Sequence, residues 1–257
     1  MLKFFRKIRQ KLLSENKFSK YLIYAIGEII LVVIGILIAL QINNWNEQRN
    51  TREKELVYLN GIRNDLEMNI IEIDEFISNR KDQVRAANEI LDHFNGKPVD
   101  DWNAFNMNTV SIYIWQRFFQ IDNTFQELIN SGNLAIISNE EIKNGLLNLD
   151  VLYKKLNYNE DHFRFDAEVT LYEPSYSMTD IQTQAGNYIY QLTGGQEGAL
   201  GDVEKNANYN EMLQDQKQKN GFAFAVLEFS TMITRFEAMK EKCKEIIELI
   251  DTEMESE

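Results

Sequence analysis

The sequence contains one cysteine, two prolines and two histidines among its 257 residues. A single cysteine excludes an internal disulfide, so the fold must be stable through packing alone. Because proline interrupts helices and is scarce here, while Glu, Lys, Leu and Gln are plentiful, the composition favours helices. We therefore predict an all-α fold in which one N-terminal transmembrane helix continues into an extracytoplasmic helical bundle with long coiled-coil-like helices.

Motifs that carry chemistry are scarce as well. A di-iron bundle needs Glu-x-x-His pairs, but the residues three positions before His93 and His162 are Ile90 and Asn159. The sequence has no His-x-x-x-His, no Gly-x-Ser-x-Gly and no phosphate-binding glycine motif. Cys243 lies in an apolar helical row, where a thiol packs as a small hydrophobic group. We expect no enzyme, and we predict no catalytic, cofactor-binding or metal-binding residue.

Positive charge is confined largely to one end of the chain. The formal net charge is −13, yet residues 1–20 hold seven Lys or Arg and one acid, a net +6, so the remainder carries −19. Nucleic-acid binding depends on basic contacts to phosphate. An acidic body of this kind therefore argues against a nucleic-acid partner.

A long apolar run follows the basic tail. Residues 21–40 are apolar or small except for Glu28. Twenty residues at about 1.5 Å rise span roughly 30 Å, the thickness of the hydrocarbon core of a bilayer. We predict a single transmembrane helix over residues 21–42, with a basic amphipathic tail over 1–20 and an acidic helical domain over 43–257.

The orientation of this span follows from the positive-inside rule, which counts Lys and Arg near the membrane ends. Seven basic residues precede the run, whereas only Arg49, Arg52 and Lys54 lie just after it. We expect a single-pass protein of a bacterial inner membrane, with a cytoplasmic N-terminus and a periplasmic C-terminal domain. A cleaved signal peptide is the alternative, but the end of the run lacks an A-x-A cleavage pattern.

The basic tail has apolar residues at helical spacing, and its cations could lie on the inner leaflet. Basic amphipathic segments bind anionic lipid through charge and apolar burial together. The predicted partner of this surface is membrane lipid, although a short basic tail can also do no more than fix topology. The predicted membrane-surface residues are Lys3, Arg6, Lys7, Arg9 and Lys11.

Glu28 is the residue of the span that most requires an explanation. A charge near the centre of a bilayer costs about 2.5–3.5 kcal/mol on insertion scales. Glu28 and Gly35 are seven residues apart, and Gly35 with Ala39 forms a small-xxx-small pair that lets two helices approach closely. These three residues predict a membrane-helix contact with a second copy or another membrane protein. The alternative is that Glu28 reaches the cytoplasmic headgroups by snorkelling.

Two segments resemble a known family. Lys20 to Glu47 reads KYLIYAIGEIILVVIGILIALQINNWNE, and Thr124 to Leu147 reads TFQELINSGNLAIISNEEIKNGLL. The first is similar to the anchor, and the second to the other recurrent motif, of an uncharacterised family of bacterial single-span membrane proteins that carries a domain of unknown function. The resemblance implies location and no activity, and it transfers no catalytic or ligand-binding residue to this chain.

Helical periodicity continues beyond the span. Two rows of mostly apolar residues step by seven or a multiple of seven, and a coiled-coil-like seam results. Asn95-Gly96-Lys97-Pro98 is predicted to end this helix, and Arg63 and Arg80 interrupt the rows. The rows are Leu56, Ile70, Ile77, Val84 and Leu91, and Leu59, Leu66, Ile73, Ala87 and Phe94.

The rest of the chain predicts further helices. Residues 102–128 place Phe105, Ile112, Trp115 and Phe119 on one helical stripe, which we assign to the core rather than to an aromatic cage. Ser131-Gly132-Asn133 predicts a helix stop, and Ser138 begins a capping box for a helix to about Tyr158.

The final third of the chain divides into an irregular segment and a helix. Residues 173–220 lose their periodicity and contain four closely spaced glycines, which predicts a loop-rich insert. Residues 222–254 restore the apolar rows and predict a helix that can pair with the first long helix. If these two are antiparallel, the segment of residues 102–165 packs on them as a bundle.

Three hypotheses for function follow from these observations. The first is a membrane-anchored periplasmic scaffold or accessory subunit of a membrane complex, which associates with itself or a partner through the span and the long helices. The second is a ligand-sensing bundle coupled through the anchor helix. The third is an enzyme of unrecognised type. We expect a homo-oligomer or a complex with another membrane protein.

Overall fold

The computed structural model describes residues 18–255, and these residues form helices and no strand. The chain divides into two units, unit 1 (Met1–Val57) and unit 2 (Tyr58–Glu257). Because the described residues form helices and no strand, the predicted all-α class is confirmed. The helices are α2 (Phe18–Phe94), α3 (Trp102–Tyr113), α4 (Asn123–Asn130), the 3-10 turn η1 (Leu134–Ile136), α5 (Glu140–Ala167), the π-helical turn η2 (Glu168–Tyr172), α6 (Glu173–Met178), α7 (Ile181–Leu192), α8 (Val203–Asn206), α9 (Tyr209–Met212) and α10 (Gln216–Glu255).

Helix α2 is 77 residues long and unbroken. Its apolar part lies in unit 1, where large side chains such as Ile23 and Leu31 are exposed. Among the described residues α2 is the one helix long and apolar enough to cross a membrane, judged by length and composition. It ends at Phe94, followed by Gly96 with a φ of 103°. The predicted stop at residues 95–98 is thus confirmed, because glycine readily takes this left-handed conformation.

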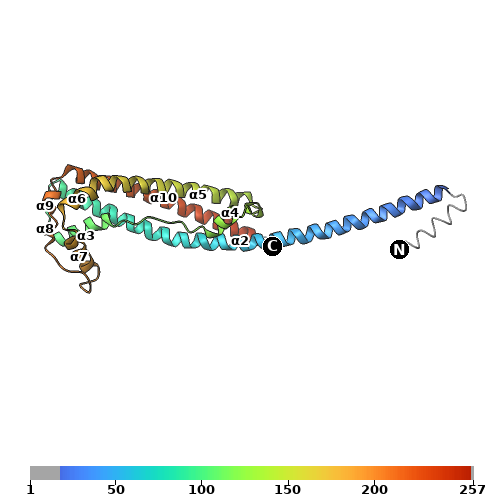
Figure 1. Ribbon diagram of the computed structural model, residues 1–257, viewed down its shortest axis with the longest axis horizontal. Coiled ribbons are helices and arrows are strands. Elements are labelled where there is room, and N and C mark those ends of the chain that lie inside the picture. Colours follow the sequence, from blue (N-terminus) through green and yellow to red (C-terminus); the bar gives the residue numbers. More distant parts are fainter. Residues whose placement is uncertain (1–17, 256–257) are drawn as a thin grey trace. The chain divides into compact units, whose positions relative to one another are not determined.

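Unit 2 is built around three long helices: the second half of α2, α5 and α10 (Figure 1). Helix α10 runs antiparallel to α2, since Arg63 Nε lies 2.7 Å from Asp251 and Lys240 Nζ 2.5 Å from Asp74. It also runs antiparallel to α5. There the ring centroids of Phe163 and Phe229 are 4.5 Å apart, and a Cβ on Gly145 would lie 2.9 Å from Ile246. The core lies between these helices.

A third buried row on α2 accompanies the two rows seen in the sequence. Ile62, Asn69 and Ile90 are at most 1% exposed, Gln83 is 9% exposed, and all lie seven or fourteen residues apart. This row mixes apolar and polar side chains, unlike the mainly apolar rows beside it. Asn69 of this row faces a part of the fold that is not helical.

That part is residues 115–122, which we call the strap. It runs along the bundle from α3 to α4, between α2 and α5 (Figure 1). The prediction of one helical stripe through residues 102–128 is therefore wrong beyond Tyr113. Phe119, assigned to the core, is 69% exposed, whereas its neighbour Phe118 is fully buried. An extended backbone turns successive side chains to opposite sides, and β-branched and aromatic residues suit this conformation.

Helix α2 continues through Gly61, which packs against the first turn of α4. A Cβ at this position would come within 2.9 Å of the Thr124 side chain. The Thr124 N–H donates to the Asp65 carboxylate of α2 at 2.9 Å. The missing side chain thus lets the first turn of α4 approach α2 closely.

Helix α5 begins where the sequence predicted but extends further. Asn139, rather than Ser138, is the N-cap, and its side chain accepts from the N–H groups of Glu141 and Ile142. The predicted end near Tyr158 is wrong, since α5 reaches Ala167 and η2 and α6 follow directly. No glycine or proline lies between Gly145 and Pro174 to stop it.

Residues 173–220, expected to be a loop-rich insert, contain the four helices α6–α9 and an irregular stretch over 193–202. A buried polar network fixes α7 and α9 to α3. Tyr209 donates to Asn106 Oδ1 at 2.6 Å, Asn106 Nδ2 donates to the Gln184 carbonyl at 3.1 Å, and Gln184 Nε2 donates to the Tyr209 hydroxyl at 2.8 Å. Each member has a partner, so the network can be buried at little cost.

Candidate functional site

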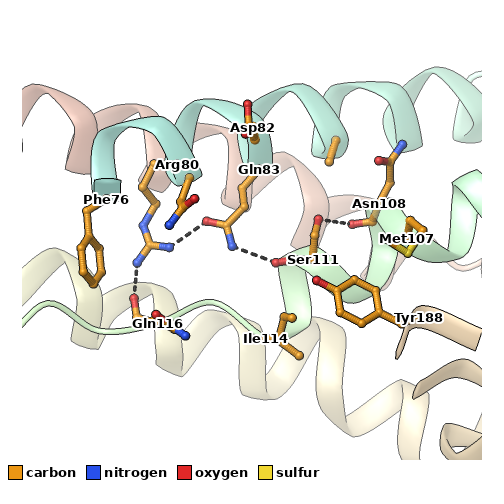
Figure 2. A pocket seen from close by; sticks show the side chains of 12 residues that line it. Phe76, Arg80, Asp82, Gln83, Met107, Asn108, Ser111, Ile114, Gln116 and Tyr188 are labelled. Carbon is orange, nitrogen blue, oxygen red and sulfur yellow. Dashed lines mark hydrogen bonds between the residues drawn. The ribbon is translucent and has the colours of Figure 1, made fainter. Parts of the chain in front are cut away.

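A cleft of about 380 Å³ opens between α2, α3 and α7 (Figure 2). Its walls combine the charged side chains of Arg80 and Asp82 with neutral polar groups and apolar side chains. The lining residues are Phe76, Asn79, Arg80, Asp82, Gln83, Ala86, Met107, Asn108, Ser111, Ile114, Gln116 and Tyr188.

Arg80 is the charged group at the inner end of this cleft and is only 1% exposed. One terminal nitrogen donates to Gln83 Oε1 at 2.7 Å, and the other donates to the Gln116 carbonyl (Figure 2). The guanidinium also lies 4.9 Å from the Phe229 ring and 5.5 Å from that of Trp115. Burial lowers the pKa of Arg80 to about 10, against the opposing effect of Glu160. Arg80 is therefore a cation at neutral pH, stabilised by a carbonyl, an amide and aromatic faces.

Gln83 extends these contacts from α2 to α3. Its Nε2 donates to the Ser111 carbonyl at 2.8 Å, while Ser111 Oγ donates to the Asn108 carbonyl at 2.7 Å (Figure 2). The Gln83 amide thus accepts from Arg80 through its oxygen and donates to Ser111 through its nitrogen. Walls that carry hydrogen-bonding side chains beside a buried cation fit a small polar ligand.

The strap borders the cleft through Gln116 and continues to a second buried charge, Glu160 of α5, which is fully buried. The Phe118 N–H donates to Glu160 Oε1 at 3.0 Å, and Arg117 Nε lies 3.5 Å from Glu160 Oε2. Burial raises the pKa of Glu160 to about 7, although the Phe118 N–H, Arg80 and Arg117 all favour the ionised form. Desolvation is the larger effect here.

Asn69 holds the far end of the strap. Its Nδ2 donates to the Ile121 carbonyl at 2.6 Å, and its Oδ1 accepts from the Ile121 N–H at 2.8 Å. The side-chain amide thus replaces the neighbouring strand that an extended segment would have in a sheet. Asn69, Arg80 and Glu160 each form a hydrogen bond to the backbone of the strap. These bonds explain why the three polar side chains are buried.

The sequence predicted only part of the arrangement of buried polar side chains around the strap and the cleft. Arg80 was an unexplained break in an apolar row, and it marks where α2 meets the strap. Asn69 and Gln83 occupy a row that was not identified, because two polar residues interrupt it. A buried asparagine in an otherwise apolar stretch of helix, as at Asn69, is the signal that could have indicated a non-helical neighbour.

The predicted membrane contact residues lie on α2 in unit 1. Glu28 is partly buried and Ala39 is exposed. Among the described residues, nothing lies within 4 Å of the position that a Cβ on Gly35 would take. The predicted membrane-surface residues Lys3, Arg6, Lys7, Arg9 and Lys11 lie outside the described residues. Both assignments stay predictions.

The histidines and the cysteine have ordinary surroundings. His162 Nδ1 lies 3.2 Å from Glu228, and His93 Nδ1 lies 2.9 Å from the Lys97 carbonyl. Burial raises the pKa of Cys243 to about 12, so its thiol is protonated at neutral pH. Within residues 18–255, no group of three or more His, Cys, Asp or Glu side chains could hold a metal ion.

Helix α5 carries an exposed apolar stripe opposite its buried face. The members are separated by four or seven residues, which places them on one side of a helix. They are between 41% and 70% exposed. An apolar stripe of this length is typical of a surface that meets another helix. The stripe, which we call the α5 stripe, consists of Leu147, Val151, Tyr158 and Phe165 of α5 and Val169 of the π-helical turn η2 that follows it.

Comparison with known proteins identifies one relationship. The model of a family described as a family of unknown function (DUF6090) matches residues 28–183, more than half of the chain. The match includes part of the apolar run, the strap and α5. No curated protein and no solved structure matches the chain.

Proposed function

We propose that this chain, which belongs to the family of unknown function DUF6090, is a membrane-anchored helical scaffold or accessory subunit of a membrane complex. In this proposal residues 21–42 cross a bacterial inner membrane once. The basic tail is then cytoplasmic, and the acidic helical domain is periplasmic. The seven basic residues before the apolar run, against three just after it, support this orientation.

The observation that carries the proposal is apolar surface exposed on two long helices. Helix α2 exposes its apolar part in unit 1, and α5 exposes Tyr158 and Phe165 at 70% each in unit 2. Exposed aromatic side chains on a rigid helix are suitable anchors for a partner. The partner in this proposal is a second copy or another membrane protein.

The test is extraction of the tagged full chain from its own membrane in mild detergent, followed by measurement of its mass and of co-purifying proteins. Glu28→Leu and Glu28→Gln test the span. The double variant Tyr158→Glu/Phe165→Glu tests the α5 stripe, and Phe119→Glu is its matched control, since Phe119 is an equally exposed aromatic residue off the stripe.

We expect a stoichiometric complex in the wild type and in the Phe119→Glu control. Loss of the complex in Glu28→Leu alone identifies the span as the binding surface, whereas loss in the double variant identifies the α5 stripe. A monomeric wild-type protein that co-purifies with nothing would contradict the proposal.

A ligand-sensing bundle is the second candidate, and the cleft beside Arg80 favours it. The cleft is open, about 380 Å³ in volume, and lined by the same helix that carries the apolar run. Native mass spectrometry of the full chain should then show a small polar molecule that Ala86→Phe, which fills the cleft, excludes. Identical spectra of both proteins would argue against sensing at this cleft.

A further inference from the structure

We propose that Glu160 and the strap form a pH-sensitive clamp, in which a proton on the Glu160 carboxyl strengthens the hold of the strap on α5. The inference concerns unit 2 alone and does not depend on the proposed function. The Glu160 carboxyl group is completely buried and incompletely hydrogen-bonded.

The two oxygens of Glu160 have unequal surroundings. Oε1 accepts from the Phe118 N–H at 3.0 Å. Oε2 is buried and has no hydrogen-bond partner among residues 18–255, although Arg117 Nε lies 3.5 Å away. An ionised carboxylate with a bare oxygen in a buried site is unfavourable, whereas a neutral carboxylic acid there is much less so.

The neighbouring charges do not remove this cost. Arg117 from the strap is engaged elsewhere, since its NH1 donates to Asp161 at 2.9 Å and its Nε and NH2 donate to Asn157. Arg80 from α2 donates to Gln83 and Gln116, and its influence on Glu160 is through space.

On α5 itself, Asp161 repels the Glu160 charge. On α10, Glu228 faces Asn159 and His162 instead. With these groups in place, burial still raises the pKa of Glu160 to about 7. The neutral and ionised forms are therefore both populated close to neutral pH.

The strap is the element that can respond. Its residues 115–121 lie outside the helices, and side chains hold the backbone at Gln116, Phe118 and Ile121. Opening the strap around Phe118 would let water reach Glu160 and return its pKa toward 4.5, the ordinary value. A group that is easier to ionise in the open state favours opening as the pH rises.

The difference between the Glu160 pKa in the closed and open states sets how the opening of the strap depends on pH. Because the pKa is raised in the closed state, the stabilisation by the proton is complete at low pH and is lost as the pH rises through about 7. The opening equilibrium of the strap should increase about tenfold between about pH 6 and pH 8. Gln116 lines the cleft, so the same change alters one of its walls.

The test is hydrogen exchange of the full chain in mild detergent, read by mass spectrometry on peptides covering residues 115–122, with rates divided by the intrinsic rate at each pH. Glu160→Gln keeps an acceptor for the Phe118 N–H but cannot titrate. Glu228→Gln is the matched control, a carboxyl residue on the adjacent helix that is 8% exposed.

We expect strap exchange to rise about tenfold from about pH 6 to pH 8 in the wild type and in Glu228→Gln, and to stay constant in Glu160→Gln. Equal pH profiles in wild type and Glu160→Gln would overturn the proposal. If Glu160→Gln does not fold, a carbon-13 NMR titration of wild type labelled at the glutamate carboxyl carbons decides. A resonance with a midpoint near 7 supports the clamp, and its absence rejects it.

Discussion

Helix α2 meets the rest of unit 2 through two kinds of contact. Toward the apolar core it presents residues such as Leu59 and Ile73, both fully buried. Against the strap it presents Asn69 and Arg80, which are buried as well. The depth of burial is similar on both sides, but the chemistry differs.

The difference follows from the neighbour's backbone. A helix satisfies its own N–H and C=O groups, so its partner needs only to fill space with apolar side chains. An extended segment without a neighbouring strand has no such internal partners, and the surrounding side chains must provide them. Buried polar residues on α2 therefore mark the nature of its neighbour rather than a reactive centre.

The largest expected effect comes from breaking a contact between helices. Phe163→Ala removes a ring that packs 4.5 Å from the Phe229 ring between α5 and α10. Because this leaves a cavity in a closely packed core, the free energy of unfolding should fall by about 3–5 kcal/mol. Urea denaturation of the full chain in mild detergent, followed by circular dichroism, measures this.

Phe163→Leu is the control, since it keeps most of the volume and should lose less than about 1.5 kcal/mol. If both variants were equally stable, the α5–α10 contact would not be a principal source of stability. The contrast between helix–helix contacts and contacts to the strap would then fail.

A smaller loss is expected on the strap side. Asn69→Leu removes both hydrogen bonds to the Ile121 backbone, and with a net contribution of about 0.5–1.5 kcal/mol for each bond the total loss should be about 1–3 kcal/mol. Hydrogen exchange at Ile121 should accelerate, while exchange in α10 changes little.

Asn69→Ala separates hydrogen bonding from volume. Equal losses in the Leu and Ala variants identify the hydrogen bonds as the cause, because only the Ala variant also leaves space. A Leu variant as stable as wild type would mean that water reaches the Ile121 backbone, and the contrast between the two contacts would fail.

The smallest effect is expected for a charge pair between α2 and α10. Lys240 Nζ lies 2.5 Å from Asp74, but the Asp74 side chain is half-exposed. Exposed pairs contribute about 1 kcal/mol or less, and salt screens them. Lys240→Met should therefore change the urea midpoint little, and the remaining difference should vanish in high salt. A large loss that persists in salt would show that packing of the lysine stem matters.

The helix contacts could be predicted from the sequence, whereas the strap contacts could not. The apolar rows through Leu59 and Ile73 and the stop before Gly96 depend on spacing and local turn chemistry, which a sequence displays directly. The strap has no glycine or proline, and its aromatic residues fit a helical stripe as well as an extended chain. Its conformation depends on Asn69, Arg80 and Glu160, which lie 35 residues or more away from the backbone groups that they hold.

The candidate site was missed for the same reason. The cleft arises where α3 ends at Tyr113 and the strap begins, and the sequence predicted a helix through that point. Arg80 was visible in the sequence as a charged residue in an apolar row, but the sequence did not show that its guanidinium binds the Gln116 carbonyl. By contrast, the ordinary surroundings of Cys243 agree with its interpretation as a small apolar side chain.

The way in which the strap is held also sets an order of events during folding. Its hydrogen-bond partners come from α2 on one side and α5 on the other, so neither helix alone can fix it. Loop closure brings distant residues together at an entropic cost that must be met first. The strap should therefore dock last, after the long helices have met. Until then residues 115–122 remain accessible to a protease, and a brief proteolytic pulse during refolding would cut the chain there first.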